Sequence, residues 1–188
     1  MLENYLKSYN ILTQSEIEAF LSRVTSKHLS KGDFFIRQGN LSKHIAFIQS
    51  GILRSFYHSS ETEEVTYCFS FQNTLITAYT SWIIEQPANE NIQALTDSEL
   101  LLISKDQVHD LENKFPNWIR FFKKVAENEF VNLERRLFLH QRESAETRYK
   151  NLLKNQPEYL HSIPLQYLAS YLGVTLRHLS RIRKSITF

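Results

Sequence analysis

The spacing of hydrophobic and polar residues changes along the chain. Residues 4–28 carry apolar side chains at helical spacing and predict a helical lead-in. From about residue 29 to residue 103, short β-rich segments are separated by turn sequences rich in Gly, Asn, Asp and Ser. These turn sequences are 30–33, 38–40, 49–51, 59–62 and 96–98. Turns that recur about every ten residues predict an antiparallel β-roll or jelly roll.

One segment of this region alternates strictly between apolar and small or polar residues. One face would carry Val65, Tyr67, Phe69 and Phe71, and the other Thr66, Cys68 and Ser70. Such alternation is typical of a half-buried strand.

Helical spacing returns at Ser104, which forms a capping-box pattern with Gln107. The longest helix is predicted over residues 117–142, where apolar residues recur every three or four positions. Because this stripe is long and wide for one small barrel to cover, we expect the helix to pair with a second copy across a two-fold axis. Packing against its own barrel is the alternative. The predicted dimer interface consists of Trp118, Phe122, Val125, Ala126, Phe130, Leu133 and Leu137.

Residues 162–184 predict two short helices joined by a turn. Gly173 lies where a chain reversal favours a residue that tolerates positive φ, and Thr175 is placed to cap the second helix. Leu179 and Ile182 would face the first helix. The second helix then presents four Lys or Arg residues and no acid between positions 175 and 184. A helix–turn–helix lays such a helix in the DNA major groove, whereas a solvated basic hairpin is the alternative.

The predicted DNA-binding residues divide by chemistry. Arg177 and Arg181 are expected to read bases, since arginine can donate two hydrogen bonds to guanine, and His178 and Ser180 are further candidates for base contacts. Phosphate contacts are expected from Thr175, Arg183 and Lys184.

Composition supports a polyanion partner at one end of the chain. The 188 residues have a net charge of +2, but residues 143–188 hold seven Lys or Arg against three Asp or Glu, and residues 1–142 hold fifteen against seventeen. The single cysteine, Cys68, excludes an internal disulfide, and no apolar run approaches the ~20 residues of a membrane span. We therefore expect a cytoplasmic protein without membrane association. The predicted organisation is a β-roll domain with its N-terminal helix over 1–116, a dimerisation helix over 117–142 and a helix–turn–helix domain over 143–188.

Enzymatic chemistry has little support in the sequence. A metal-dependent cupin shares the jelly-roll architecture and is the alternative class, but its sites need a His-x-His pair that is absent from the seven histidines. Neither a nucleophile elbow nor a phosphate-binding glycine loop is present. No cofactor or metal site is predicted. A third alternative is an interaction module without DNA binding, with Glu61, Glu63 and Glu64 as a hairpin-tip patch.

The order of β-roll, long helix and C-terminal helix–turn–helix resembles the Crp/Fnr family of bacterial transcription regulators. The segments 163–184, Ser144-Ala-Glu-Thr-Arg-Tyr149 and Ser50-Gly-Ile-Leu-Arg54 are similar to the subgroup common in Bacteroidetes. The resemblance implies an α+β protein with a cyclic-nucleotide-binding-like roll, a dimerisation helix and a winged helix–turn–helix. It also implies a homodimer that binds a palindromic operator in double-stranded DNA and contacts RNA polymerase.

The effector cassette departs from the nucleotide-binding members that this family includes. Their Gly-Glu pair aligns with Thr77 and Ala78, and their Arg-Ser pair aligns with Ala88 and Asn89, followed by Glu90. We therefore predict no tight binding of cyclic AMP or cyclic GMP. A single cysteine likewise excludes a four-thiolate iron–sulfur sensor. An unidentified apolar or aromatic effector could occupy a barrel lined by Tyr67, Phe69, Phe71, Tyr79 and Trp82, although these residues could equally be plain core.

Overall fold

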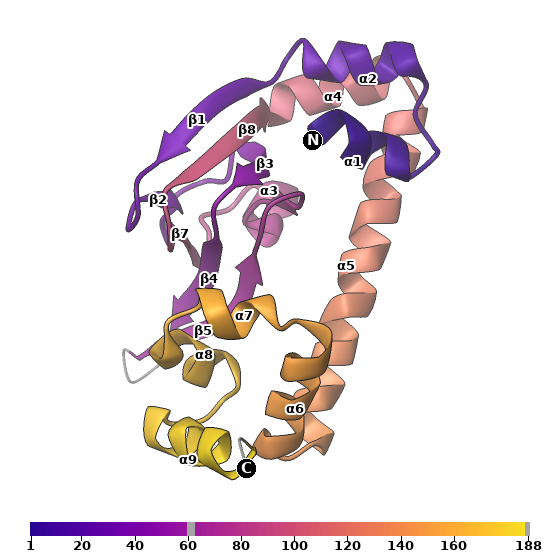
Figure 1. The fold of residues 1–188 in the computed structure, drawn as a ribbon. Helices are drawn as coiled ribbons and strands as arrows, with labels where there is room; N and C mark the ends of the chain where they lie inside the picture. The colour runs from indigo at the N-terminus through magenta and orange to yellow at the C-terminus, as the bar shows by residue number, and fades with distance from the viewer. Residues whose placement is uncertain (60–62, 187–188) are drawn as a thin grey trace. The chain divides into compact units, whose positions relative to one another are not determined.

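A computed structural model of the protein describes residues 1–59 and 63–186 (Figure 1). The chain forms two compact units. The first unit comprises Met1–Tyr57 and Phe69–Glu127, and the second comprises His58–Cys68 and Asn128–Phe188. The long helix and one β-hairpin each contribute residues to both units. Of the predicted features, Glu61 and most of the turn at 59–62 lie outside the described residues.

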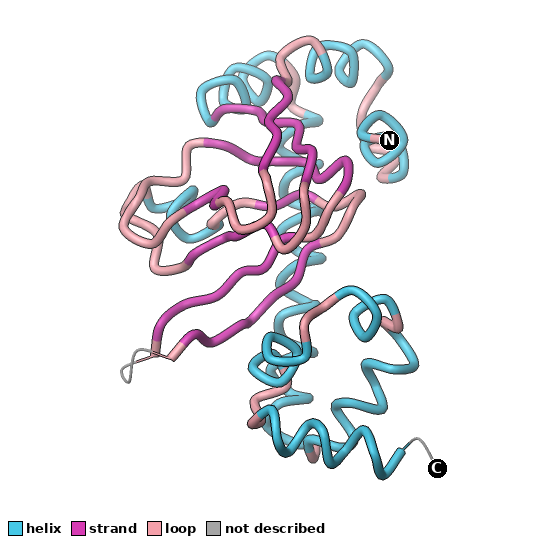
Figure 2. The backbone as a smooth tube through the Cα atoms, turned by 60° about the vertical axis from the view of Figure 1, so that its left-hand side comes forward, coloured by secondary structure: helices cyan, strands magenta, loops and turns pink. Residues whose placement is uncertain are grey.

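The strands form two four-stranded sheets, with the orders β1-β8-β3-β6 and β2-β7-β4-β5 (Figures 1 and 2). The strands are β1 (Thr25–Leu29), β2 (Phe34–Ile36), β3 (His44–Ser50), β4 (Leu53–His58), β5 (Glu64–Ser70), β6 (Leu75–Ile76), β7 (Asn91–Ala94) and β8 (Ser98–Ser104). The pairs β1–β8, β3–β8, β2–β7 and β4–β7 are antiparallel. The predicted antiparallel β-roll is confirmed.

The core of the roll is built from side chains that alternate along the strands. In β3, β7 and β8 every second residue points inward, as the two-residue period of a strand requires. Its members include Ala46, Ile48, Leu53, Ile76, Ala78, Ala88, Ile92, Ala94, Leu100 and Leu102.

Two stretches of the N-terminal half differ from the prediction. Residues 25–28 belong to β1 rather than to the helical lead-in, because they pair with β8 from Thr25 opposite Leu102 onward. The alternation of β5 is also not strict, since Thr66 is buried. The backbone N–H of Thr66 donates to Ser170 Oγ at 2.9 Å, and this hydroxyl donates to the Glu64 carbonyl at 3.0 Å. Glu64, Thr66 and Ser170 all belong to the second unit, and within that unit the contact with the helix that carries Ser170 buries Thr66, on the side of β5 that was predicted to be polar.

A second apolar cluster in the first unit joins the roll to its helices. These helices are α1 (Leu2–Ser8), α2 (Gln14–Leu21), α3 (Tyr79–Ile84), α4 (Lys105–Lys114) and the start of α5 (Asn117–Arg142). The predicted capping box of Ser104 and Gln107 begins α4, and the predicted 117–142 helix is observed with the same bounds. Trp118 stacks on Phe20 with ring centroids 4.7 Å apart and is fully buried. The prediction that Trp118 lies in a dimer interface was therefore wrong, because its own chain covers it.

The second unit contains the remaining helices, α6 (Ala145–Asn155), α7 (Glu158–Ser162), α8 (Leu165–Tyr171) and α9 (Leu176–Ile186). Ser144 caps α6 by accepting a hydrogen bond from the Thr147 backbone at 3.2 Å. Within the described chain α9 is the last element, so the wing implied by the family resemblance is not among the described residues (Figure 2). Over these same residues, no helix has the length and hydropathy needed to cross a membrane.

The turn before β4 yields a stability prediction. Gly51 has φ of +97°, and a Cβ there would lie 2.6 Å from Ser98 Cβ and 2.7 Å from Ser98 Cα. Gly32 has a similar φ of +94° with open space around it. We therefore expect Gly51→Ala to destabilise the protein by about 1–3 kcal/mol more than Gly32→Ala, because only the former adds a steric clash to the backbone strain. Urea unfolding of both variants measures this difference, and equal losses would contradict the structure.

Candidate nucleic-acid interface

The turn and the second helix of the α8–α9 pair are fixed by local chemistry that the sequence predicts. Gly173 has φ of +66°, the left-handed conformation that glycine adopts most readily. Thr175 Oγ1 accepts a hydrogen bond from the backbone N–H of His178 at 3.2 Å, which confirms the predicted cap. Leu179 and Ile182 are buried, and they share the interior with Leu168 and Ala169 of α8. The orientation of α9 about its own axis is therefore set by its apolar side.

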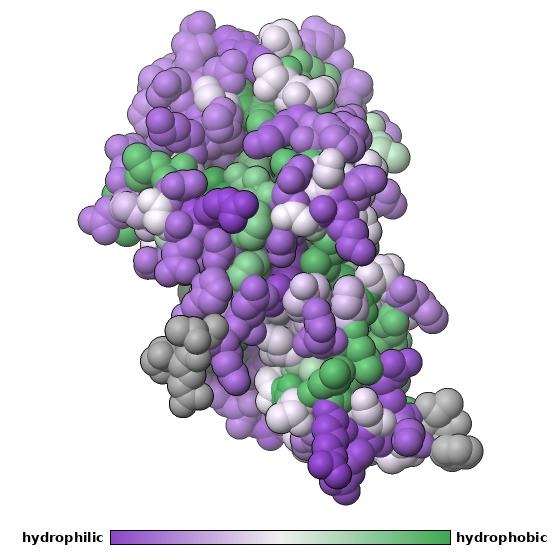
Figure 3. All heavy atoms as spheres, turned by 90° about the vertical axis from the view of Figure 1, so that its left-hand side faces the viewer, coloured by the Kyte–Doolittle hydropathy of each residue, from purple (hydrophilic) through white to green (hydrophobic). Residues whose placement is uncertain are grey.

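The opposite side of α9 is cationic and exposed. Arg177, Arg181 and Lys184 are spaced four and three residues apart, so they follow one face of the helix. Among the described residues, no ion pair or hydrogen bond engages these three side chains. Because no acid lies on α9, their charges are not neutralised by its own residues. Figure 3 shows strongly hydrophilic side chains at the lowest point of the molecule, next to an apolar patch.

The other predicted contact residues of α9 have different surroundings. His178 and Arg183 are exposed, and so is the cap residue Thr175. Ser180 is only partly exposed, and its hydroxyl donates to the Leu176 carbonyl at 2.9 Å. Ser180 is therefore the predicted base-reading residue that is already hydrogen-bonded to its own helix. Leu176, which precedes the cationic face, is an exposed apolar residue at the start of α9.

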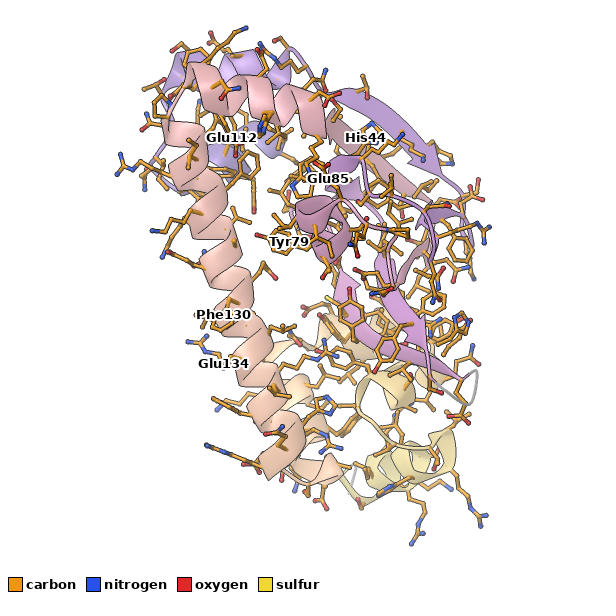
Figure 4. All side chains as sticks on the ribbon, turned by 180° about the vertical axis from the view of Figure 1, so that it is seen from behind. His44, Tyr79, Glu85, Glu112, Phe130 and Glu134 are labelled. Carbon is orange, nitrogen blue, oxygen red and sulfur yellow. The ribbon has the colours of Figure 1, made fainter. Side chains whose placement is uncertain are left out.

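Helix α5 carries two apolar stripes rather than one. Trp118 and Phe121 are buried in the first unit, and Phe122 and Val125 pack partly against the same cluster. The second stripe follows positions 119, 126, 130, 133 and 137, whose spacings of seven, four, three and four residues keep them on one face. Its large members are exposed: Ile119 54%, Phe130 66%, Leu133 60% and Leu137 53%. Figure 4 shows Phe130 projecting from α5.

The second stripe is the one that the single chain leaves largely exposed, whereas Phe122 and Val125 of the predicted interface are partly buried. It includes Ala126, Phe130, Leu133 and Leu137 of the predicted interface, and it adds Ile119, which the sequence reasoning missed. The signal that places Ile119 in the second stripe is its spacing of seven and eleven residues from positions 126 and 130, which puts it on the same face of the helix.

The aromatic residues predicted to line the barrel do not share one interior. Trp82 packs in the cluster of helices α1, α2, α4 and α5, and Tyr79 on α3 is 54% exposed (Figure 4). Trp82 is therefore a core residue, which is the alternative that the sequence left open, whereas Tyr79 lies at the surface and does not line the barrel. Phe69 is buried, whereas Tyr67 and Phe71 are partly buried.

The cassette around α3 contains no basic group at the predicted phosphate-binding positions. Thr77 Oγ1 donates to the His44 carbonyl at 3.0 Å, so this hydroxyl serves the roll itself. Ala78 and Ala88 are buried within the apolar core, and Asn89 is exposed. Lys105 donates to the Trp82 carbonyl at 2.6 Å and to Glu85 Oε1 at 2.6 Å, which holds the C-terminal end of α3. The hydrogen bond from Lys105, together with its positive charge, lowers the pKa of the Glu85 carboxyl.

Comparisons with known proteins agree with this architecture. Residues 26–114 match the model of the cyclic nucleotide-binding domain. FixK2 from Bradyrhizobium japonicum has a TM-score of 0.76 at 14% identity, covering 87% of this chain and 84% of that one. A protein from Eubacterium rectale ATCC 33656 described as a crp/fnr-family transcriptional regulator has a TM-score of 0.76 at 17% identity, covering 98% and 88%.

A third structure is the c-di-GMP responsive global regulator CLP from Xanthomonas campestris. Its TM-score is 0.73 at 17% identity, covering 93% of this chain and 92% of that chain. A comparison of the sequence with curated proteins finds no significant match. Residues 26–114 are therefore similar to a cyclic nucleotide-binding domain, and the chain has the fold of Crp/Fnr transcription regulators. The Eubacterium and Xanthomonas proteins are both described as regulators, and neither is described as an enzyme. Within the described residues, no group of His, Cys, Asp and Glu is placed to hold a metal ion.

The cassette predicts the outcome of a nucleotide-binding experiment. Isothermal titration calorimetry with cyclic AMP and cyclic GMP should show no binding in the low-micromolar range, because a charge-assisted arginine contact contributes about 1.5–3 kcal/mol and is missing here. Low-micromolar affinity for either nucleotide would contradict the assignment of Ala88 to the arginine position.

Proposed function

We propose that this protein is a sequence-specific DNA-binding transcription regulator of the Crp/Fnr type, which binds a palindromic operator as a homodimer. The observation that carries the proposal is the exposed row of Arg177, Arg181 and Lys184, opposite the buried residues Leu179 and Ile182. Because the apolar side of α9 packs against α8, the cationic side is the one that remains accessible to a partner. Double-stranded DNA is the polyanion whose major groove admits a helix of this kind.

The proposed contacts follow from side-chain chemistry. Arg177 and Arg181 would donate to guanine O6 and N7, which discriminates among bases. Lys184, Arg183 and Thr175 would contact phosphates, which sets the register on the duplex but carries no sequence information. His178 would be a further base contact.

The proposed dimer would join the exposed stripes of two α5 helices. Burial of one large apolar side chain contributes roughly 1.5–3 kcal/mol, and Ile119, Phe130, Leu133 and Leu137 are left exposed by the single chain. A two-fold pair would present two α9 helices to half-sites about 34 Å apart on one face of DNA. RNA polymerase and an unidentified small-molecule effector are the further proposed partners, and the cytoplasm is the proposed location.

The proposal is tested by selecting duplexes from a random pool with the purified protein. A recovered palindrome that binds with at least about a thousandfold preference over a scrambled duplex at physiological salt would support it. Recovery of unrelated sequences, with equal affinity for both duplexes, would contradict it.

The division of roles along α9 gives a further prediction. Arg181→Ala should weaken binding to the selected duplex by about 1–3 kcal/mol and relax the preference at one base pair. Lys184→Ala should weaken binding to all sequences alike and reduce the salt dependence by about one unit. Fluorescence anisotropy over a salt series separates these effects, and identical behaviour of the two variants on matched and scrambled duplexes would refute the division.

The dimer predicts a specific effect of charge on the exposed stripe. Leu133→Glu should produce a single chain of 22.2 kDa in sedimentation equilibrium, because it places a carboxylate in the apolar contact between two helices. Asn132→Glu introduces the same charge at an exposed neighbouring position off the stripe and should leave the dimer intact. A Leu133→Glu variant that remains dimeric would exclude this interface.

A further inference from the structure

The ends of two helices in the second unit converge on one guanidinium group. Arg148, in the first turns of α6, donates from Nη1 to the Glu143 carbonyl at 2.7 Å and to the His140 carbonyl at 3.4 Å. Its Nη2 and Nε donate to the Leu172 carbonyl at 2.8 Å and 3.2 Å. His140 lies in the last turn of α5, Glu143 follows that helix, and Leu172 is the C-cap of α8. Carbonyl groups at helix C-terminal ends lack partners within the helix and carry partial negative charge, so a cation is well matched to them.

Two further residues of α5 contact the same end of α8. The guanidinium of Arg136 lies over the Tyr171 ring, 4.3 Å from its centroid. The His140 ring lies beside Gly173, where an added Cβ would be 3.6 Å from Cε1 and 3.7 Å from Nδ1. Burial, followed by the charges of Arg136 and Arg148, lowers the pKa of His140, so the neutral imidazole is favoured there. All these contacts lie at the residues that lead directly into Gly173 and α9.

We propose that Arg148 is a positioning residue for DNA recognition, which fixes the direction of α9 by bridging the C-terminal carbonyls of α5 and α8. This inference rests on the proposed function. The connection from Leu172 to Thr175 is short, so the direction in which α8 ends determines where α9 begins. An arginine is needed because its planar group presents donors along two edges at once, whereas a lysine ammonium is a single point of charge.

The test compares Arg148→Lys with Arg148→Gln and with Arg142→Lys. Arg142 is a matched control, since it is an exposed arginine at the end of α5 whose guanidinium lies over the Phe138 ring instead of on helix carbonyls. Each variant of the full-length protein is measured by anisotropy on the pool-selected duplex and on its scrambled counterpart, over a series of salt concentrations.

A positioning role predicts that Arg148→Lys lowers the selected-to-scrambled affinity ratio by about tenfold or more, the scale of one misplaced bidentate base contact. The salt dependence should stay unchanged, and Arg142→Lys should keep the ratio of the wild type. The inference is overturned if Arg148→Lys retains that ratio. It is also overturned if Arg148→Gln weakens both duplexes equally and flattens the salt dependence by about one unit, because Arg148 would then contact a phosphate.

Hydrogen exchange separates this inference from the proposed function, since it needs no DNA. In the free protein, backbone amides at 172–179 should exchange faster in Arg148→Lys than in the wild type or in Arg142→Lys, with no change at 117–127. Unchanged exchange at 172–179 would overturn the bridge whatever the protein binds. A wild type that shows the protected turn but an affinity ratio near one would instead overturn the proposed function.

Discussion

Burial of Leu179 and Ile182 against α8 is the interaction on which the candidate DNA-binding surface depends. It fixes the rotation of α9, and each buried side chain of this size contributes roughly 1.5–3 kcal/mol. The cationic row lies on the opposite side of the helix and is exposed. Gly173 and the cap at Thr175 then determine where the helix starts. In the proposed function, DNA recognition would need few residues, because the packing that buries the apolar side of α9 also sets where Arg177, Arg181 and Lys184 point.

The long helix α5 serves two purposes along its length. Its first turns bury Trp118 and Phe121 beside α2 and so belong to the core of the first unit. Its second stripe leaves large apolar side chains in water, an arrangement that is unfavourable unless another molecule covers them. A single amphipathic pattern in the sequence therefore contains a structural stripe and a candidate association stripe, offset around one helix.

Local features of the fold could be predicted from the sequence, and long-range ones could not. The capping box at Ser104, the bounds of α5 and the turn at Gly173 depend on residues that are close in the chain. The burial of Trp118 depends on Phe20, almost a hundred positions away, and the periodicity within 117–142 does not say which of the two stripes the chain itself covers. The Arg148 bridge was missed for the same reason, because it unites α5, α6 and α8. The sequence signals of Arg148 were its place shortly after the Ser144 cap and within the 144–149 segment that resembles the family, and neither names the carbonyls that it bridges.

Hydroxyl-radical footprinting of the protein on a pool-selected duplex tests the central claim most directly. Two symmetric α9 helices in successive major grooves predict two protected patches one helical turn apart, about 10 base pairs, on one face of the DNA. A footprint confined to a single patch, or uniform protection without a preferred position, would contradict the account of a two-fold regulator that reads DNA with α9.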